Sequence, residues 1–296
     1  MIQGWSNYLS GDIKMKLTKD NAAQILTCRK DEEDERDYSF SSTVPDKIEQ
    51  RVRATPSRVD HGQKMTGVRN QGQLGSCVSF AVAAVKEWQE KAEHEAEVAA
   101  GKRDHRKGKE YNLSESWIYW NAKKIDPWPN EEGTSIRCGM KVIRSLGTPC
   151  EEAWPYNDIN YGEPKSWAPL IARWGRIESY WRVNNLDEMK VALLEGPLVI
   201  GIPCFEEIFY ADETGYIPYP ANPSVVYGGH AVCVMGYNDS QNLITFKNSW
   251  GRGWGNKGYG LLSYRYINDF LWDAWACKDV SMTKELLKEE KSLFSL

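Results

Sequence analysis

The hydrophobic pattern of this 296-residue chain changes its period partway along the sequence. Before Pro169, apolar residues recur every three or four positions, which is typical of amphipathic helices. After Pro169, short apolar runs are separated by turns that contain Gly and Pro, which is typical of strands. A helical segment followed by a strand-rich segment predicts an α+β fold with two lobes. Because ligand sites favour the clefts between lobes, we expect the functional residues at the boundary of the two.

The first segment contains three predicted helices. The clearest begins at Cys77, where apolar side chains at positions 78, 81, 82, 85 and 88 fall on one face of a 3.6-residue period. The second covers residues 114–124, with Ser114 as its N-cap, and the third covers residues 134–146. These helices predict a mainly helical lobe over residues 56–165.

The second segment predicts a mainly β lobe over residues 166–281. One helix, residues 186–195, interrupts the strands and stops before a Gly-Pro pair. Residues 282–296 are a predicted tail with a short amphipathic helix at 285–293. The predicted strands are 176–180, 198–202, 230–237, 243–248 and 259–263.

Residues 1–55 are a predicted N-terminal extension. They have few periodic apolar positions and carry a dense acidic run from Asp31 to Asp37. Runs of like charge are usually solvated, so the extension can be a solvated arm. It can also be a pro-segment that covers an active site, and the sequence leaves both interpretations open.

Charge and composition exclude several classes of partner. The formal net charge is −4 and the sequence pI is about 5.7, which gives no electrostatic basis for binding nucleic acid or an anionic membrane. No apolar run approaches the roughly 18 residues of a membrane span, and the N-terminus lacks the apolar stretch of a secretory signal. The cytoplasm is therefore the expected location. The sequence carries no signal for an oligomeric state.

The seven cysteines are widely spaced and none forms a C-x-x-C pair. This spacing argues against a zinc ribbon or a thioredoxin-like redox pair. We expect most of them to be reduced, and the odd number leaves at least one unpaired within the chain. No metal or organic cofactor is predicted.

Cys77 stands at the start of its predicted helix, where unpaired backbone N–H groups and the helix dipole favour an anion. A thiolate is such an anion, so this position lowers the pKa of the thiol and favours a nucleophile. A buried cysteine is more often inert packing. Position alone therefore leaves both roles open for Cys77.

His230 and Asn248 are suitable partners for a nucleophilic thiol. His230 follows a Gly-Gly pair at the start of a predicted strand, and an imidazole can hold or move a proton near neutral pH. A lone histidine is usually structural, but of the four histidines only this one joins a glycine pair to an apolar strand. Asn248 ends the next strand, where its amide could orient the ring while Trp250 screens that bond from water.

The three residues together are more specific than any one of them. His230 follows Cys77 by 153 residues and Asn248 follows His230 by 18, in the order nucleophile, base and orienting residue of a thiol hydrolase. The segments that carry them are Gln71-Gly-Gln-Leu-Gly-Ser-Cys77, Gly229-His-Ala-Val232 and Asn248-Ser-Trp-Gly251, followed by Trp254-Gly255. These motifs resemble those of the papain-like cysteine peptidases, and more narrowly the bacterial-type members, over residues 56–280.

The resemblance implies four catalytic residues. Cys77 matches the nucleophile, His230 the general acid and base, and Asn248 the residue that orients the imidazole. Gln71 matches the side-chain donor of the oxyanion hole, with the backbone N–H of Cys77 as the second donor. The family fold would place Cys77 at the head of a long helix in the helical lobe, and His230 and Asn248 in a β-barrel-like lobe across an active-site cleft.

The resemblance also implies a binding surface for an extended peptide. Gly133 and Thr134 match the segment that hydrogen-bonds substrate backbone, and Ile136 would line a specificity pocket. For Gly133 to Ile136, an ordinary helix start with one core side chain is the alternative. Gly229 would border the same surface. Two further residues, Trp250 and Trp254, would support the site.

The implied activity is hydrolysis of peptide bonds through a thioester, with peptides or proteins as substrates. Two alternatives share the same residues: a ligase or transpeptidase, in which an amine resolves the thioester, and a catalytically silent peptide-binding module. Leu74 stands where the family often has a cysteine, so the usual disulfide there is absent, which suits a reducing compartment. The helix motif common in pro-segments of the family is missing from residues 1–55, which weighs against inhibition by this extension.

Overall fold

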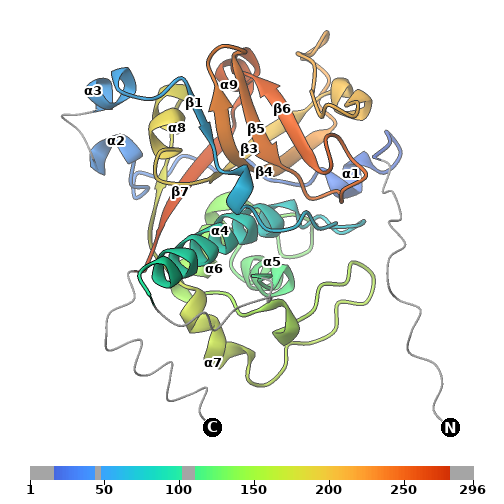
Figure 1. Cartoon of the computed structure of the whole chain (residues 1–296). Helices are drawn as coiled ribbons and strands as arrows, with labels where there is room; N and C mark the ends of the chain where they lie inside the picture. Colours follow the sequence, from blue (N-terminus) through green and yellow to red (C-terminus); the bar gives the residue numbers. More distant parts are fainter. Residues whose placement is uncertain (1–16, 44–47, 102–110, 281–296) are drawn as a thin grey trace, which may run out of the picture.

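A computed structural model describes residues 17–43, 48–101 and 111–280. The helices α5 (Glu115–Lys123), α6 (Ile136–Ser145) and α7 (Ala168–Ala172) lie on one side of the molecule and an antiparallel sheet with several short helices on the other, with the long helix α4 (Cys77–Ala99) between them (Figure 1). This arrangement confirms the predicted α+β fold with two lobes.

The remaining helices are short. The helix predicted at Ser114 is confirmed, since α5 begins one residue later and the Ser114 side chain accepts from the N–H of Trp117. In the described ranges no helix is long and apolar enough to cross a lipid bilayer. The helices are α1 (Ala22–Ile25), α2 (Phe40–Thr43), α3 (Ile48–Arg53), α5 (Glu115–Lys123), α6 (Ile136–Ser145), α7 (Ala168–Ala172), α8 (Leu186–Ala192) and α9 (Tyr264–Phe270).

The strands form one sheet in the order β2-β7-β3-β4-β5-β6, and β1 pairs with the far end of β4. All pairings are antiparallel. The five predicted strands are present with end shifts of up to two residues, whereas β1 and β7 were not predicted. The strands are β1 (Arg58–Asp60), β2 (Ile177–Arg182), β3 (Leu198–Cys204), β4 (Gly228–Asn238), β5 (Leu243–Lys247), β6 (Tyr259–Ser263) and β7 (Asp273–Asp279).

The predicted barrel-like shape is wrong in one respect, because the sheet is open. Its edge strands are β2 and β6, and each edge is covered by a segment outside the sheet. Ser39 bridges Arg182 at the edge of β2, and Tyr216 bridges Leu261 at the edge of β6. These segments bond to backbone groups of Arg182 on β2 and Leu261 on β6, and the two edge strands are not paired with each other.

The two lobes meet where α4 packs against β4. Side chains alternate across a strand, so Ala231, Cys233 and Met235 of β4 lie in one buried cluster with Val82 and its neighbours on α4. The β4 residues between them point to the opposite face, into the larger core of the β lobe. The cluster positions the start of α4 beside the start of β4.

Several element boundaries differ from the prediction. α6 begins at Ile136 rather than at residue 134, because Ser135 is extended and its side chain caps the N–H of Cys138. α8 ends three residues early, at Ala192, and α9 was not predicted. β7 was missed because its apolar run, residues 274–277, is short and lies between charged residues. The predicted helix at 285–293 lies outside the described residues.

Residues 17–43 pack on the rest of the chain, so the interpretation of this part of the extension as a solvated arm is wrong, although Glu32, Glu33 and Glu35 of the acidic run are exposed. α1 and α2 lie on opposite sides of the molecule, so the chain between them crosses it (Figure 1). Ile25 and Phe40 are buried in the core of the β lobe, and Asp31 is only 4% exposed. The Asp31 carboxylate accepts from the backbone N–H of Arg137 at 3.0 Å and from the indole N–H of Trp275 at 3.1 Å. These partners satisfy a carboxylate that would otherwise be costly to bury.

We expect Met140→Ala to lower the free energy of unfolding by about 2–5 kcal/mol, because it leaves a cavity between α6 and α4. Met140 is fully buried in the cluster that joins the lobes. The measurement is urea unfolding of the full chain, followed by circular dichroism. Lys141→Ala, at the exposed neighbouring position, is the matched control and should stay within about 0.5 kcal/mol. Equal effects of the two variants would contradict this packing.

Candidate active site

The Cys77 thiol lies at the N-terminus of α4 and is fully buried. Its pKa is held well below the ordinary thiol value, mainly by the neighbouring Cys28 thiol and further by His230, against the opposing effect of burial. Burial instead raises the pKa of the Cys204 and Cys233 thiols, the latter to about 12. Cys77 is therefore placed to be a thiolate while these other cysteines keep their protons.

His230 is the third residue of β4 and lies opposite Ile202 of β3. Its Nε2 is 2.8 Å from Oδ1 of Asn248, so Nδ1 is the nitrogen left to exchange a proton with Cys77. Trp250 stacks on the imidazole with ring centroids 4.4 Å apart, and Trp254 packs edge-on against Trp250. The amide and the two indoles hold the ring in one orientation.

Gln71 is fully buried, and the residue after Asn248 sets its orientation. The Ser249 hydroxyl donates to Oε1 of Gln71 at 2.6 Å, and the Gln71 backbone N–H donates to the Ser249 carbonyl at 2.8 Å. Nε2 donates one hydrogen to the carbonyl of Leu74 at 3.0 Å. Because Oε1 is taken as the acceptor, the second hydrogen on Nε2 remains for another acceptor.

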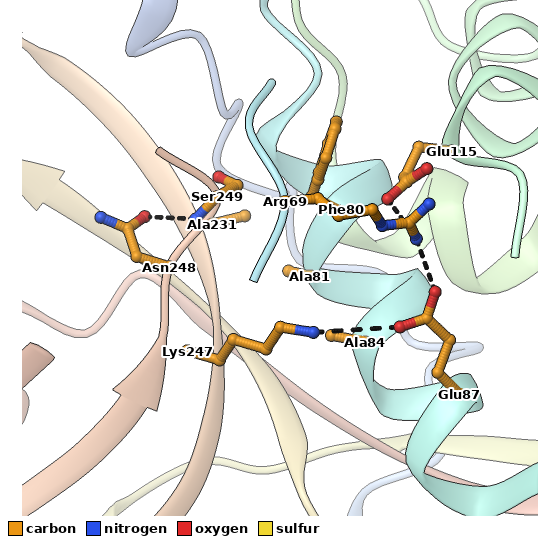
Figure 2. A pocket seen from close by; sticks show the side chains of 10 residues that line it. All are labelled: Arg69, Phe80, Ala81, Ala84, Glu87, Glu115, Ala231, Lys247, Asn248 and Ser249. Carbon is orange, nitrogen blue, oxygen red and sulfur yellow. Dashed lines mark hydrogen bonds and ion pairs between the residues drawn. The ribbon is translucent and has the colours of Figure 1, made fainter. Parts of the chain in front are cut away.

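A buried charged cluster lies behind these residues, between the lobes (Figure 2). Glu87 of α4 pairs with Arg69 at 2.5 Å and with Lys247 of β5 at 3.9 Å, and Arg69 also pairs with Glu115 of α5. Burial raises the pKa of Glu115 and lowers that of Lys247. The cavity that they line has about 10 Å³, room for about one water molecule. The cluster therefore links the lobes and is too confined for a substrate.

The predicted substrate-binding residues hold part of the chain's own extension, residues 26–29, which we name the docked segment. The N–H of Cys28 donates to the carbonyl of Gly229, and the N–H of Arg29 donates to the carbonyl of Thr134, both at 3.0 Å. The two acceptors lie on opposite lobes, so the docked segment spans the space between them.

Gly133 and Gly229 leave the room that the docked segment needs. Gly133 has a φ of +82°, and a Cβ there would come within 1.9 Å of the Thr27 carbonyl oxygen. A Cβ at Gly229 would come within 2.2 Å of the Cys28 carbonyl oxygen. The N–H of Gly229 also donates to the Leu26 carbonyl at 3.1 Å. The glycines therefore permit a backbone to approach on both sides.

Sequence reasoning assigned no role to Cys28. This residue is 3% exposed and shares a buried cluster with Cys77 and Ile136. No pattern in a single sequence pairs residue 28 with residue 77. In the described ranges, no group of three or more His, Cys, Asp or Glu side chains is arranged to hold a metal ion.

Two further residues near Gln71 were also missed. The Tyr156 hydroxyl donates to the Gln71 carbonyl at 2.6 Å and lies 2.7 Å from the hydroxyl of Ser76, the residue before the nucleophile. Nothing in the sequence near Tyr156 indicates this contact. Ser249 stands inside the motif that contains Asn248, which is a signal that could have identified it.

Comparison with known proteins identifies the family. A family model described as papain family cysteine protease matches residues 55–270. An uncharacterised peptidase C1-like protein of Acanthamoeba polyphaga mimivirus is 29% identical over 72% of this chain and 70% of its own length. Mouse cathepsin K is 29% identical over 77% of this chain. The chain spans 65% of the length of cathepsin K and 55% of that of a viral cathepsin from Epiphyas postvittana nucleopolyhedrovirus.

Comparison with solved structures supports the same family. Xylellain, a cysteine protease from Xylella fastidiosa, is 28% identical, covers 87% of this chain and 97% of its own, and superposes with a TM-score of 0.74. The family model spans well over half of the sequence and includes all four residues predicted to be catalytic. This chain therefore belongs to the papain family of cysteine proteases.

Proposed function

We propose that this chain hydrolyses peptide bonds with Cys77 as nucleophile, and that its own docked segment keeps it latent. The observation that carries the proposal is that residues 26–29 occupy the backbone groups of Gly229 and Thr134 while Cys28 lies against Cys77. A substrate and the docked segment would compete for the same groups.

The acylation step uses the groups around Cys77. The thiolate attacks the scissile carbonyl, and the negative charge that develops on its oxygen is stabilised by Nε2 of Gln71 and the N–H of Cys77. His230 then donates a proton to the leaving amine, while Asn248 holds its ring in place through the 2.8 Å hydrogen bond. A thioester remains on Cys77.

In the second half-reaction, His230 removes a proton from water, which attacks the thioester and releases the acid product. No step requires a group from outside the chain other than water and the peptide.

Latency is supported by how the docked segment meets the nucleophile. The group of the docked segment that lowers the pKa of Cys77 is the Cys28 thiol, which offers no carbonyl for attack. Charged contacts hold the segment downstream, where Arg137 pairs with Asp37 at 2.5 Å and Arg182 pairs with Asp37 at 3.5 Å. The docked segment therefore fills the site without being positioned as a substrate.

Similar structures include precursors. A stem bromelain precursor and a digestive procathepsin L 3 of Tenebrio molitor cover 90% and 88% of this chain with TM-scores of 0.62 and 0.63, which shows a shared fold. The seven cysteines are all free, which favours a reducing compartment such as the cytoplasm as the place of action.

Removal of the extension should activate the chain. We expect kcat/KM of a chain that begins at Val44 to exceed that of the full chain by more than about tenfold. This ratio holds when the docked segment is released in less than a tenth of the full-length molecules. The measurement is cleavage of a fluorogenic peptide pool under reducing conditions.

A synthetic peptide of residues 17–43, added to the shortened chain, should restore the inhibition, and a scrambled peptide is its control. Equal rates of the full and shortened chains would remove the inhibitory role of the segment.

Gln71→Ala should lower kcat of the shortened chain by about 10²–10³, because one donor to the developing oxyanion is lost, while KM changes little. Gln73→Ala, at an exposed glutamine two residues on, is the matched control and should leave kcat unchanged. Cys77→Ala should abolish turnover in the same assay. Retained turnover in the purified Cys77→Ala variant would contradict the mechanism.

The shortened chain lacks Cys28, but His230 and the backbone N–H of Ala231 still lower the pKa of Cys77, so Cys77 should react first with iodoacetamide at pH 6 because the thiolate is the reactive form. Cys204 and Cys233, whose pKa values are raised, serve as internal controls and should remain unmodified. Mass mapping of the alkylated peptides gives the order of reaction. Equal, slow modification of all seven cysteines would favour a silent scaffold.

A further inference from the structure

Cys28 is the residue of the docked segment that contacts the catalytic centre. Its side chain is 3% exposed and lies with the fully buried Cys77 in the cluster between the lobes. Each thiol shifts the pKa of the other, the Cys28 thiol donates to the carbonyl of Arg29 at 3.8 Å, and neither thiol takes part in a disulfide. The mechanism of peptide hydrolysis has no use for a second thiol at this place.

The backbone on both sides of Cys28 is fixed. Its own N–H is bonded to Gly229 on the β lobe, and the next N–H is bonded to Thr134 on the helical lobe, both at 3.0 Å. Two residues further on, the N–H of Asp31 donates to the Asp273 carboxylate at 2.8 Å. The position of Cys28 between the lobes is therefore held by bonds that do not involve its sulfur.

The two thiols differ in protonation. The neighbouring Cys28 thiol and the nearby imidazole lower the pKa of Cys77, whereas the neighbouring Cys77 and burial raise the pKa of Cys28. Cys77 is thus placed to be a nucleophilic thiolate, whereas Cys28 keeps its proton. A thiol of low pKa with a second cysteine near it is one feature of redox-sensing cysteine pairs.

We propose that Cys28 is the resolving thiol of a redox latch, which forms a disulfide with Cys77 and locks the docked segment over the active site. The oxidant is a peroxide, and hydrogen peroxide is close to water in size. The inference rests on the proposed latency, since the latch holds in place the segment that confers it.

The chemistry is balanced in two steps. The Cys77 thiolate attacks one oxygen of hydrogen peroxide, the O–O bond breaks, and the departing hydroxide takes a proton from the imidazolium of His230 to leave as water. The Cys28 sulfur then attacks the resulting sulfenic acid. An S–S bond forms, the S–O bond breaks, and the hydroxyl leaves with the Cys28 proton as a second water. Two thiols lose two electrons, and the peroxide gains them.

The latch has two consequences. The disulfide prevents release of the docked segment, so the oxidised chain stays latent even where the reduced chain would be activated. It also protects Cys77, because a sulfenic acid without a neighbouring thiol proceeds to sulfinic acid, which thiols do not reduce. A dithiol reverses the disulfide by exchange and restores the reduced pair.

The test is mass mapping of the full chain after treatment with hydrogen peroxide, with proteolysis under non-reducing conditions. We expect a cross-linked pair of peptides that contain Cys28 and Cys77, two hydrogens lighter than the separate peptides and absent after treatment with dithiothreitol. In Cys28→Ser the cross-link should be missing and Cys77 should appear as sulfinic acid at the same peroxide concentration. Cys138→Ser, which removes another buried cysteine outside the site, is the matched control and should retain the cross-link.

Sulfinic acid at Cys77 of the unaltered chain to the same extent as in Cys28→Ser would overturn the latch, as would a disulfide between Cys77 and another cysteine. The result is scored by mass and needs no turnover. If the shortened chain is activated but no cross-link forms, the latch alone fails. If the full chain is as active as the shortened chain, the proposed latency fails, and with it the control that the latch would exert.

Discussion

The packing of α4 against β4 is the interaction on which the rest of this structure depends. The apolar face of α4 lies on one set of alternating β4 side chains, while the other set lies in the core of the β lobe. Because Cys77 is the first residue of α4 and His230 the third residue of β4, this contact brings thiol and imidazole together. A shift of the helix by one turn, about 5.4 Å, would separate them.

Buried charges restrict that packing to one arrangement. Glu87 on α4 meets Lys247 on β5 and Arg69, and Arg69 also meets Glu115 on α5. Leaving one partner of a buried ion pair alone costs about 3–5 kcal/mol, so a different alignment of the lobes is penalised. Lys247 directly precedes Asn248, so the cluster also anchors the chain at the residue that orients His230. The small cavity among these charges belongs to the scaffold and not to the binding surface.

The docked segment occupies the backbone groups of the peptide-binding surface that we propose. The glycines at 133 and 229 leave space for any extended backbone, and the carbonyls and N–H groups around them do not distinguish a substrate from residues 26–29. A segment tethered to the protein also avoids the loss of translational freedom that a separate peptide incurs. Charged contacts at Asp31 and Asp37 add an anchor away from the reacting atoms.

Much of the secondary structure could be predicted from local sequence patterns. These patterns predicted the helix that begins at Cys77, five of the seven described strands, and the candidate histidine and asparagine, because periodicity, capping and turn residues act over a few neighbouring positions. The tertiary structure alone shows that Cys28 lies near Cys77, that Asp31 and Asp37 of the acidic run pair with Arg137, and that the sheet is open. These contacts join residues far apart in the chain, and nothing periodic in residues 17–43 marks which side chains are to be buried.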